Sequence, residues 1–109
     1  MKFAIAVSSF NKEVTNGLLS GAKTYLSGKK AEFDVFEVPG AFELPLVAKK
    51  LASRKDYAGV ICLGCVIKGD TMHFEFISLA SAVGILQASL ETNKPVSFGV
   101  DRKSTRLNS

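Results

Sequence analysis

The sequence predicts an α/β protein of one domain, a three-layer sandwich around a four-stranded parallel sheet. Two observations predict this class. Short apolar runs alternate along the chain with longer segments of helical period. The first run is apolar at nearly every position, which is typical of a parallel strand covered on both faces. With 109 residues, 47% of them hydrophobic and 22% charged, the chain has room for only one domain.

The first half of the chain contains two strands and a helix, each with its own stop signal. Apolar residues recur at helical spacing until Gly28, and an alternating run then ends at Pro39-Gly40. The expected elements are a strand over 2–7, a turn over 8–11, a helix from Glu13 to Gly28 and a strand over Glu32–Val38.

The second half repeats the alternation, with Pro45 tolerated because it falls in the first turn of a short helix. A long apolar segment that is too long for a strand predicts a largely buried helix. The expected elements are a helix from Phe42 to Leu51, a strand over Tyr57–Val66, a loop over Gly64–Asp70, a helix over Met72–Leu90, a break at Asn93-Lys94-Pro95 and a strand over Val96–Val100.

The charge of the chain does not favour a nucleic-acid partner. The formal net charge is +4, and Arg102, Lys103 and Arg106 against Asp101 account for +2 of it. The other lysines are scattered over the expected helices, without a basic stripe interleaved with aromatic residues. We therefore expect solvated helix faces and no nucleic-acid binding.

Cys62 and Cys65 form a Cys-x-x-Cys pair that is open to a redox or zinc interpretation. They lie in an apolar run, with no second pair and one histidine in the chain, so we expect buried, reduced, structural cysteines and no metal. We find no secretory signal pattern and no apolar stretch of about 18 residues, so we expect a cytoplasmic protein without a membrane partner. So small a domain has little stability to spare, which makes self-association a natural remedy.

Functional residues are expected in the turns after the strands, because ligands of such sheets bind beyond the carboxyl ends of the strands. Between Gly69 and His73 a strand passes into a helix, and free backbone amides with the helix dipole favour an anion there. N-capping by Asp70 or Thr71 is the compatible alternative. His73, the only histidine, would titrate near neutrality as a proton donor or acceptor; a structural or merely exposed histidine is the alternative.

Aromatic and acidic side chains mark two other turns. Phe10 follows the first strand, where its ring would either stack on a flat heterocycle or pack as a staple against the first helix. Glu43 begins a helix, where the dipole alone favours a carboxylate. With the backbone amides of Ala41 and Phe42 it also offers donors and acceptors to a polyhydroxylated chain. Phe98, near the end of the fourth strand, has core packing as its alternative.

Four segments, in order and at similar separations across residues 3 to 100, closely resemble the lumazine synthase family. They are Ser9-Phe10-Asn11, Pro39-Gly40-Ala41-Phe42-Glu43, Gly64-Cys65-Val66-Ile67-Lys68-Gly69-Asp70-Thr71-Met72-His73-Phe74 and Phe98-Gly99-Val100. The resemblance implies a flavodoxin-like fold, whereas periodicity predicts only the α/β class.

The resemblance also implies a pocket for the first substrate, 5-amino-6-(D-ribitylamino)uracil. Phe10 would stack on the pyrimidine, and Phe98 would close that pocket from a neighbouring subunit. Ala41, Phe42 and Glu43 would bind the ribityl side, and Cys65, Val66 and Ile67 would line the pocket through their backbone. Cys65 stands where alanine or threonine is common in the family, which is tolerable for a backbone contact.

For the second substrate, 3,4-dihydroxy-2-butanone 4-phosphate, the resemblance places the phosphate end at Asp70 and Thr71 and proton transfer at His73. The family joins the two substrates by imine formation, phosphate elimination, ring closure and dehydration, without a metal or cofactor. The implied assembly is a pentamer, sometimes built up into decamers or a sixty-subunit shell.

The last nine residues depart from the family. After Val100 the family continues with a threonine-rich loop and two helices that carry a phosphate-binding arginine. Residues 101–109 instead resemble translated sequencing-adapter DNA, which suggests an assembly artefact. We therefore expect an incomplete domain over 1–100, without its C-terminal helices, and a non-native disordered tail over 101–109. Exposed apolar sheet surface and impaired activity would follow.

Two other functions are compatible with the same fold. One is a non-catalytic flavin- or lumazine-binding module, since fold and pocket do not guarantee turnover. The other is a purely structural shell subunit. His73 and the Asp70-Thr71 pair favour the enzyme, because a pure binder needs neither proton transfer nor a second phosphate site.

Overall fold

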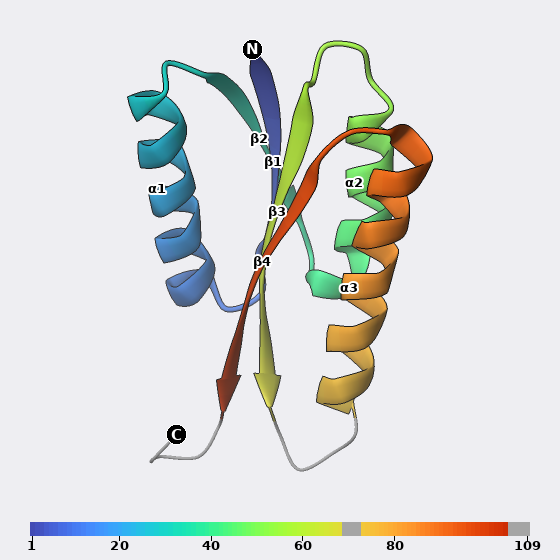
Figure 1. Cartoon of the computed structure of the whole chain (residues 1–109). Helices are drawn as coiled ribbons and strands as arrows, with labels where there is room; N and C mark the ends of the chain where they lie inside the picture. Colours follow the sequence, from blue (N-terminus) through green and yellow to red (C-terminus); the bar gives the residue numbers. More distant parts are fainter. Residues whose placement is uncertain (69–72, 105–109) are drawn as a thin grey trace.

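The computed structural model describes residues 1–68 and 73–104 and forms one sheet with helices on both faces (Figure 1). The elements are β1 (Lys2–Ser8), α1 (Lys12–Gly28), β2 (Glu32–Val38), the 3-10 turn η1 (Ala41–Glu43), α2 (Leu44–Ala52), β3 (Gly59–Lys68), α3 (His73–Thr92) and β4 (Val96–Ser104).

The four strands are all parallel, in the order β2-β1-β3-β4. In Figure 1, α1 lies against one face of the sheet, and α2 and α3 lie together against the other. The predicted three-layer α/β class is therefore confirmed, and the arrangement is consistent with a flavodoxin-like fold.

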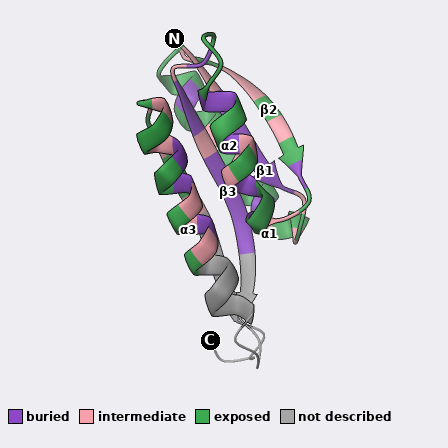
Figure 2. Ribbon diagram, turned by 90° about the vertical axis from the view of Figure 1, so that its right-hand side faces the viewer, coloured by how far each residue is buried: buried purple, intermediate pink, exposed green. Residues whose placement is uncertain are grey.

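Two apolar clusters separate the layers, one on each face of the sheet. β1 contributes to both, because its side chains alternate: Ala4 and Ala6 pack toward α2 and α3, whereas Ile5 and Val7 pack toward α1. This confirms that the first strand is covered on both faces. Figure 2 shows the resulting buried band along β1 and β3.

Most element boundaries agree with the sequence, but two strands are longer than predicted. β3 continues to Lys68, beyond the predicted strand end at Val66, so Gly64 to Lys68 are strand although we also expected a loop over Gly64–Asp70. β4 continues to Ser104 and pairs with β3 over this stretch, from Gly64 opposite Val100 to Lys68 opposite Ser104. The strand thus crosses residue 100, where we placed the end of the domain. Residues 105–109 of the expected tail lie outside the described residues.

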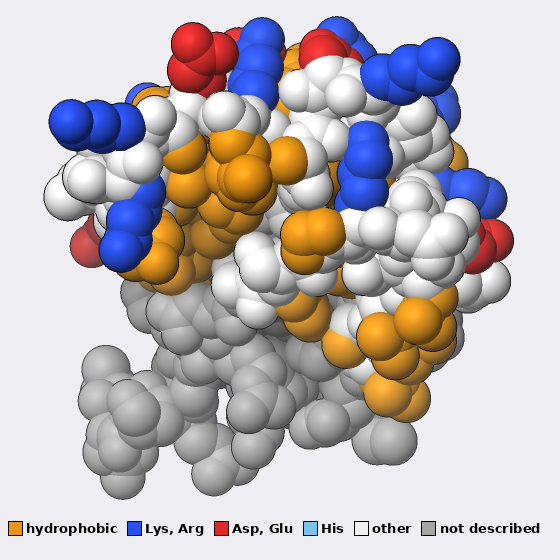
Figure 3. All heavy atoms as spheres, turned by 45° about the horizontal axis from the view of Figure 1, so that its top comes forward, with side chains coloured by type: hydrophobic (Ala, Val, Ile, Leu, Met, Phe, Trp, Pro, Cys, Tyr) orange, Lys and Arg blue, Asp and Glu red, His pale blue; other side chains and the backbone are white. Residues whose placement is uncertain are grey.

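The prediction that α3 is largely buried is wrong for its outward side. Of its described side chains, only Ser81, Ile85 and Ala88 are buried, because these positions form the one stripe that faces α2 and the sheet. The opposite side carries four exposed leucine and valine residues: Leu79, Val83, Leu86 and Leu90. We call these four residues the α3 apolar stripe. Figure 2 shows exposed positions along α3, and Figure 3 shows apolar side chains at the surface.

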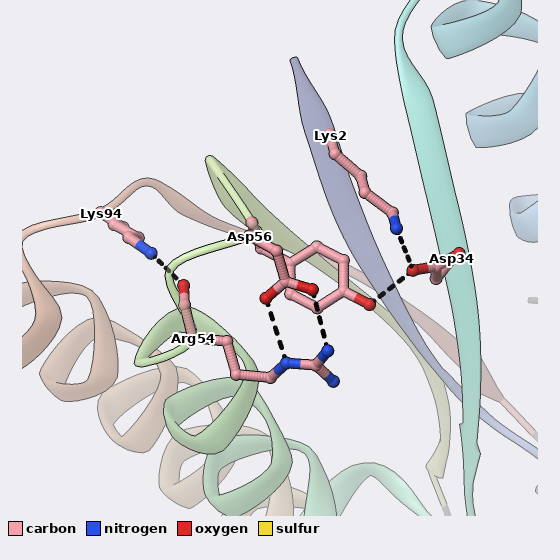
Figure 4. Close-up of polar contacts among 6 residues, drawn as sticks. Lys2, Asp34, Arg54, Asp56 and Lys94 are labelled. Carbon is pink, nitrogen blue, oxygen red and sulfur yellow. Dashed lines mark hydrogen bonds and ion pairs between the residues drawn. The ribbon is translucent and has the colours of Figure 1, made fainter.

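A polar cluster closes the amino ends of the strands (Figure 4). Tyr57 is 2% exposed and donates a hydrogen bond of 2.6 Å from its hydroxyl to Asp34. Lys2 pairs with the same carboxylate at 3.0 Å, and the guanidinium of Arg54 lies 4.9 Å from the Tyr57 ring centroid. Arg54 also holds Asp56 through two hydrogen bonds. This cluster seals the α2/α3-side core at the end opposite the predicted site.

Among the described residues, no helix combines the length and the apolar character that a membrane span requires.

Candidate active site

The carboxyl ends of β1 and β2 are tied together by backbone and serine hydrogen bonds. The amide of Ser9 donates to the carbonyl of Val38 at 2.7 Å, and the Ser9 hydroxyl reaches the Pro39 carbonyl at 3.4 Å. Ser8, which is buried, accepts the Phe10 amide on its Oγ at 3.1 Å. The first two predicted site segments therefore meet at one edge of the sheet, as parallel pairing requires.

Phe10 presents its ring to solvent at this edge. Its side chain is 48% exposed, and Phe10 belongs to neither apolar cluster. The chain turns directly after it, at Asn11, which has a left-handed backbone (φ 56°) and directly precedes α1. Packing as a staple against α1, the alternative for this ring, would bury it further than the structure does.

η1 carries the Ala41-Phe42-Glu43 segment with one residue buried and two exposed. Ala41 lies in the α2/α3-side core, whereas Phe42 and Glu43 are exposed. The Glu43 carboxylate folds back over Gly40, because a Cβ built on Gly40 would lie 3.2 Å from its Oε1. The exposed residues Phe42 and Glu43 thus follow the buried Ala41 directly, and they lie near the turn that contains Phe10.

β3 brings its part of the predicted site past the end of β1. Val7 is level with Leu63 in the register, so Cys65, Val66 and Ile67 run on toward the edge that holds Phe10. Cys65 is 1% exposed. Asp70 and Thr71 lie outside the described residues, and His73 is the first residue of α3.

Phe98 is not brought to the same edge within one chain. It pairs with Cys62 in the register, before the carboxyl end of the edge strand β4, and β3 separates β4 from β1. Its side chain is 37% exposed, so the alternative of a fully buried core residue does not hold.

The two cysteines are buried, in agreement with the prediction of structural thiols. They are three residues apart on one strand, so they point to opposite faces of the sheet and cannot form a disulfide with each other. Burial raises the pKa of the Cys62 thiol to about 12, which keeps it protonated and unreactive. Within residues 1–68 and 73–104, no three metal-ligating side chains gather.

Two buried serines that were not predicted as site residues form hydrogen bonds to the backbone of the predicted site segments. Ser8 holds the turn of Phe10, and Ser81 donates from its buried Oγ to the carbonyl of Ala41 at 3.1 Å. Their positions in the sequence could have identified them, because each is a hydroxyl residue in an apolar segment at the spacing of residues that face the core. A hydroxyl buried there needs a partner.

The fold and the site together define an α/β protein with a small-molecule site at the carboxyl ends of a parallel sheet. The model of the 6,7-dimethyl-8-ribityllumazine synthase family matches residues 1–107, and the chain belongs to this family. These enzymes are transferases of riboflavin biosynthesis. The match includes residues 101–107, which we had set apart from the family.

Curated relatives support the assignment at high identity. A 6,7-dimethyl-8-ribityllumazine synthase of Caulobacter vibrioides is 56% identical over 102 residues, which cover 91% of this chain and 67% of the relative. The enzymes of Syntrophus aciditrophicus and Thermus thermophilus are 53% and 52% identical, each over 92% of this chain, and the matches cover 67% and 66% of their lengths. The chain therefore spans about two-thirds of the length of these relatives.

Proposed function

We propose that this chain condenses 5-amino-6-(D-ribitylamino)uracil with 3,4-dihydroxy-2-butanone 4-phosphate to give 6,7-dimethyl-8-ribityllumazine, phosphate and water. The observation that carries the proposal is the exposed Phe10 ring beside the Ala41 to Glu43 segment at one edge of the sheet, in a chain of this family. A flat ring to stack on and a carboxylate beside backbone amides suit a heterocycle with a polyhydroxylated arm.

In the proposed mechanism the protein mainly positions the substrates and moves protons. Phe10 binds the pyrimidine, and Phe42 and Glu43 bind the ribityl arm, which leaves the 5-amino group toward the start of α3. That amine forms an imine with the ketone and releases water, and phosphate then leaves. The enol left by phosphate loss becomes a ketone, the ribityl-bearing nitrogen attacks its carbonyl carbon to close the ring, and a second water leaves. His73 takes and returns protons in these steps. Orientation of two reactants is the larger contribution in such a reaction.

The direct test follows the absorbance and fluorescence of the lumazine product after both substrates are mixed with the purified chain. We expect turnover that His73→Ala slows at least about tenfold, since a positioned acid–base group typically contributes about 10²-fold or more. Phe10→Ala should raise the KM for the uracil by about tenfold through lost stacking. Tyr25→Ala is the matched control, because Tyr25 is also an exposed aromatic residue but lies near the far end of α1.

The result that contradicts the proposal is a folded, assembled chain that binds the lumazine but makes no product. That result would favour the binding-module interpretation. If Tyr25→Ala raised the KM as much as Phe10→Ala, the effect could not be attributed to the position of Phe10 at the site.

We also propose that the working form is a homo-oligomer, with the pentamer implied by the family resemblance as the expected state. The support is the α3 apolar stripe, whose members Leu79, Val83, Leu86 and Leu90 are 53% to 69% exposed. Their spacing of four, three and four residues is that of a coiled-coil seam. A groove of about 280 Å³ between α2 and α3 lies next to it, lined by Pro45, Leu46, Lys49, Gly84, Gln87, Ala88 and Glu91. A second copy of the chain would cover this surface.

A further inference from the structure

We propose that Ser81 is a positioning residue for the ribityl-binding segment, an inference that rests on the function proposed above. The Ser81 hydroxyl donates a hydrogen bond of 3.1 Å to the carbonyl oxygen of Ala41. Both residues are buried, at 1% and 5% exposure. The bond joins α3 to η1, two elements whose contacting residues lie 40 positions apart in the sequence.

The partner of Ser81 distinguishes it from Thr15, Ser53 and Thr92. A serine or threonine inside a helix commonly bonds to the carbonyl four residues earlier in the same helix. Thr15, Ser53 and Thr92 do so, with Asn11, Lys49 and Ala88 as their acceptors. Ser81 instead bonds to a different element, at the base of the predicted site.

The hydrogen bond fixes the place of η1 and is not needed to form it. The Ala41 carbonyl also accepts the amide of Leu44, so it keeps a partner when the Ser81 hydroxyl is removed. Phe42 and Glu43 follow directly after Ala41 and are exposed. Without the hydroxyl the turn can therefore still form, but it is no longer anchored to α3 and opens more often, which releases Phe42 and Glu43.

The close approach of α3 to α2 sets the geometry of this bond. A Cβ built on Gly84 would lie 2.7 Å from the Pro45 Cβ, so only glycine allows the two elements to come this near. Ser81, Gly84, Ile85 and Ala88 share one helical stripe, and Ser81 lies one turn closer to the start of α3. α3 begins at His73, so the bond couples the ribityl-binding segment to the helix that carries the proposed proton-transfer residue.

The test measures both KM values and kcat for Ser81→Ala and Ser81→Cys. Cysteine fills a similar volume but is a weak donor, so it removes the hydrogen bond and keeps the packing. We expect the KM for the ribitylaminouracil to rise about three- to tenfold in both variants, in line with one lost hydrogen bond. We expect kcat and the KM for the butanone phosphate to stay close to those of the unchanged chain, because His73 and the phosphate segment are not touched.

Ser89→Ala is the matched control. Ser89 lies in the same helix and also donates to a carbonyl outside it, Lys94 at 2.7 Å, but at the end remote from the site. An unchanged KM in the Ser81 variants, or an equal rise in Ser89→Ala, would overturn the proposal. A rise in Ser81→Ala without one in Ser81→Cys would do the same, because packing and not the hydrogen bond would then be the cause.

A second measurement separates this inference from the proposed function. If the unchanged chain makes no product, the proposed function fails, and amide hydrogen exchange at Glu43 and Leu44 decides the role of Ser81 alone. These amides donate to Gly40 and Ala41 within η1. Faster exchange there in Ser81→Ala than in Ser89→Ala supports the anchor, and equal exchange overturns it.

Discussion

Tyr57 illustrates how a single polar side chain can occupy the interior of this small domain. Its ring packs edge-on against Phe36, with centroids 6.1 Å apart, while its hydroxyl bonds to the half-exposed Asp34. Burial and the neighbouring carboxylate raise the pKa of Tyr57, so its hydroxyl stays protonated and remains a donor. Asp34 is the matching acceptor, held from its other side by Lys2.

Asp34 should make the domain sensitive to acid. The hydrogen bonds from Tyr57 and Lys2 hold the pKa of Asp34 below its ordinary value of 3.8. As the pH falls, Asp34 therefore takes up a proton in the unfolded chain before it does so in the folded chain. The stability that Asp34 contributes is complete above the ordinary value and is lost as the pH falls through the lowered pKa. We expect the urea midpoint of Asp34→Asn to change less than that of the unchanged chain between neutral pH and the acid range.

Asp56→Asn serves as the control for this prediction. Asp56 lies beside the same ring but pairs with Arg54 on the surface, where an ion pair contributes about 1 kcal/mol or less. An acid dependence that Asp34→Asn leaves unchanged would contradict the assignment to Asp34.

At the residue scale, the sequence indicated which positions matter more readily than what they contact. Phe10 could be singled out because an aromatic ring in a turn is unusual. The partner of Ser81 could not be predicted, because the serine looks the same in the sequence whether its hydroxyl bonds within its helix or to a carbonyl 40 residues away. Partners of this kind depend on which helices pack together, and the sequence pattern does not specify that.

At the scale of elements, the contact between α2 and α3 is set by one glycine. Alanine at Gly84 would bring its Cβ to 2.7 Å and 2.8 Å from the proline ring of Pro45, which cannot move aside as a flexible side chain would. We expect Gly84→Ala to lower the free energy of unfolding by about 1–3 kcal/mol, despite the better helix propensity of alanine. Urea denaturation measures this change.

Gly17→Ala and Gly21→Ala provide the comparison. A Cβ at either glycine of α1 meets nothing within 4 Å. The same substitution should therefore raise the free energy of unfolding by about 0.5–1 kcal/mol at each position, through helix propensity alone. If Gly84→Ala raised the free energy of unfolding as much as these two substitutions, the close approach of α2 and α3 would not limit the residue size at position 84.

The elements themselves were predictable where local signals delimit them. Gly28 marks the end of the first helix and Pro39-Gly40 marks the end of the second strand, and both elements are confirmed. The extension of β3 to Lys68 was not predictable, because glycine and lysine there favour a loop and only pairing with β4 holds them in a strand. The outward exposure of α3 was missed for a related reason: its apolar residues surround the helix, and periodicity cannot tell a covered face from an uncovered one.

At the scale of the whole molecule, the helices on the two sides of the sheet differ in the polarity of their outward-facing side chains. On the α1 side the helix presents mostly polar residues outward, with Tyr25 as its exposed aromatic residue. On the α2/α3 side the apolar stripe and Leu46 remain open to solvent. A contiguous apolar surface of this kind is typical of a protein interface, so the same side that builds half of the core also offers the surface for assembly.

Leu86→Lys should therefore separate assembly from folding. Leu86 is 60% exposed in the single chain, so lysine there leaves the core intact but places a charge in the proposed seam. We expect the unchanged chain to sediment as a multiple of its 11.7 kDa. Leu86→Lys should sediment as a monomer that keeps its helical circular dichroism, although its urea midpoint falls with the loss of assembly. Turnover should fall with assembly if, as the family resemblance implies, Phe98 closes the pyrimidine pocket from a neighbouring subunit, because β3 separates its strand from β1 within one chain. Tyr25→Lys, an exposed aromatic position on α1, should keep both assembly and turnover. An unchanged chain that turns over as a monomer would show that each site is complete within one copy, and the α3 apolar stripe would then need another partner.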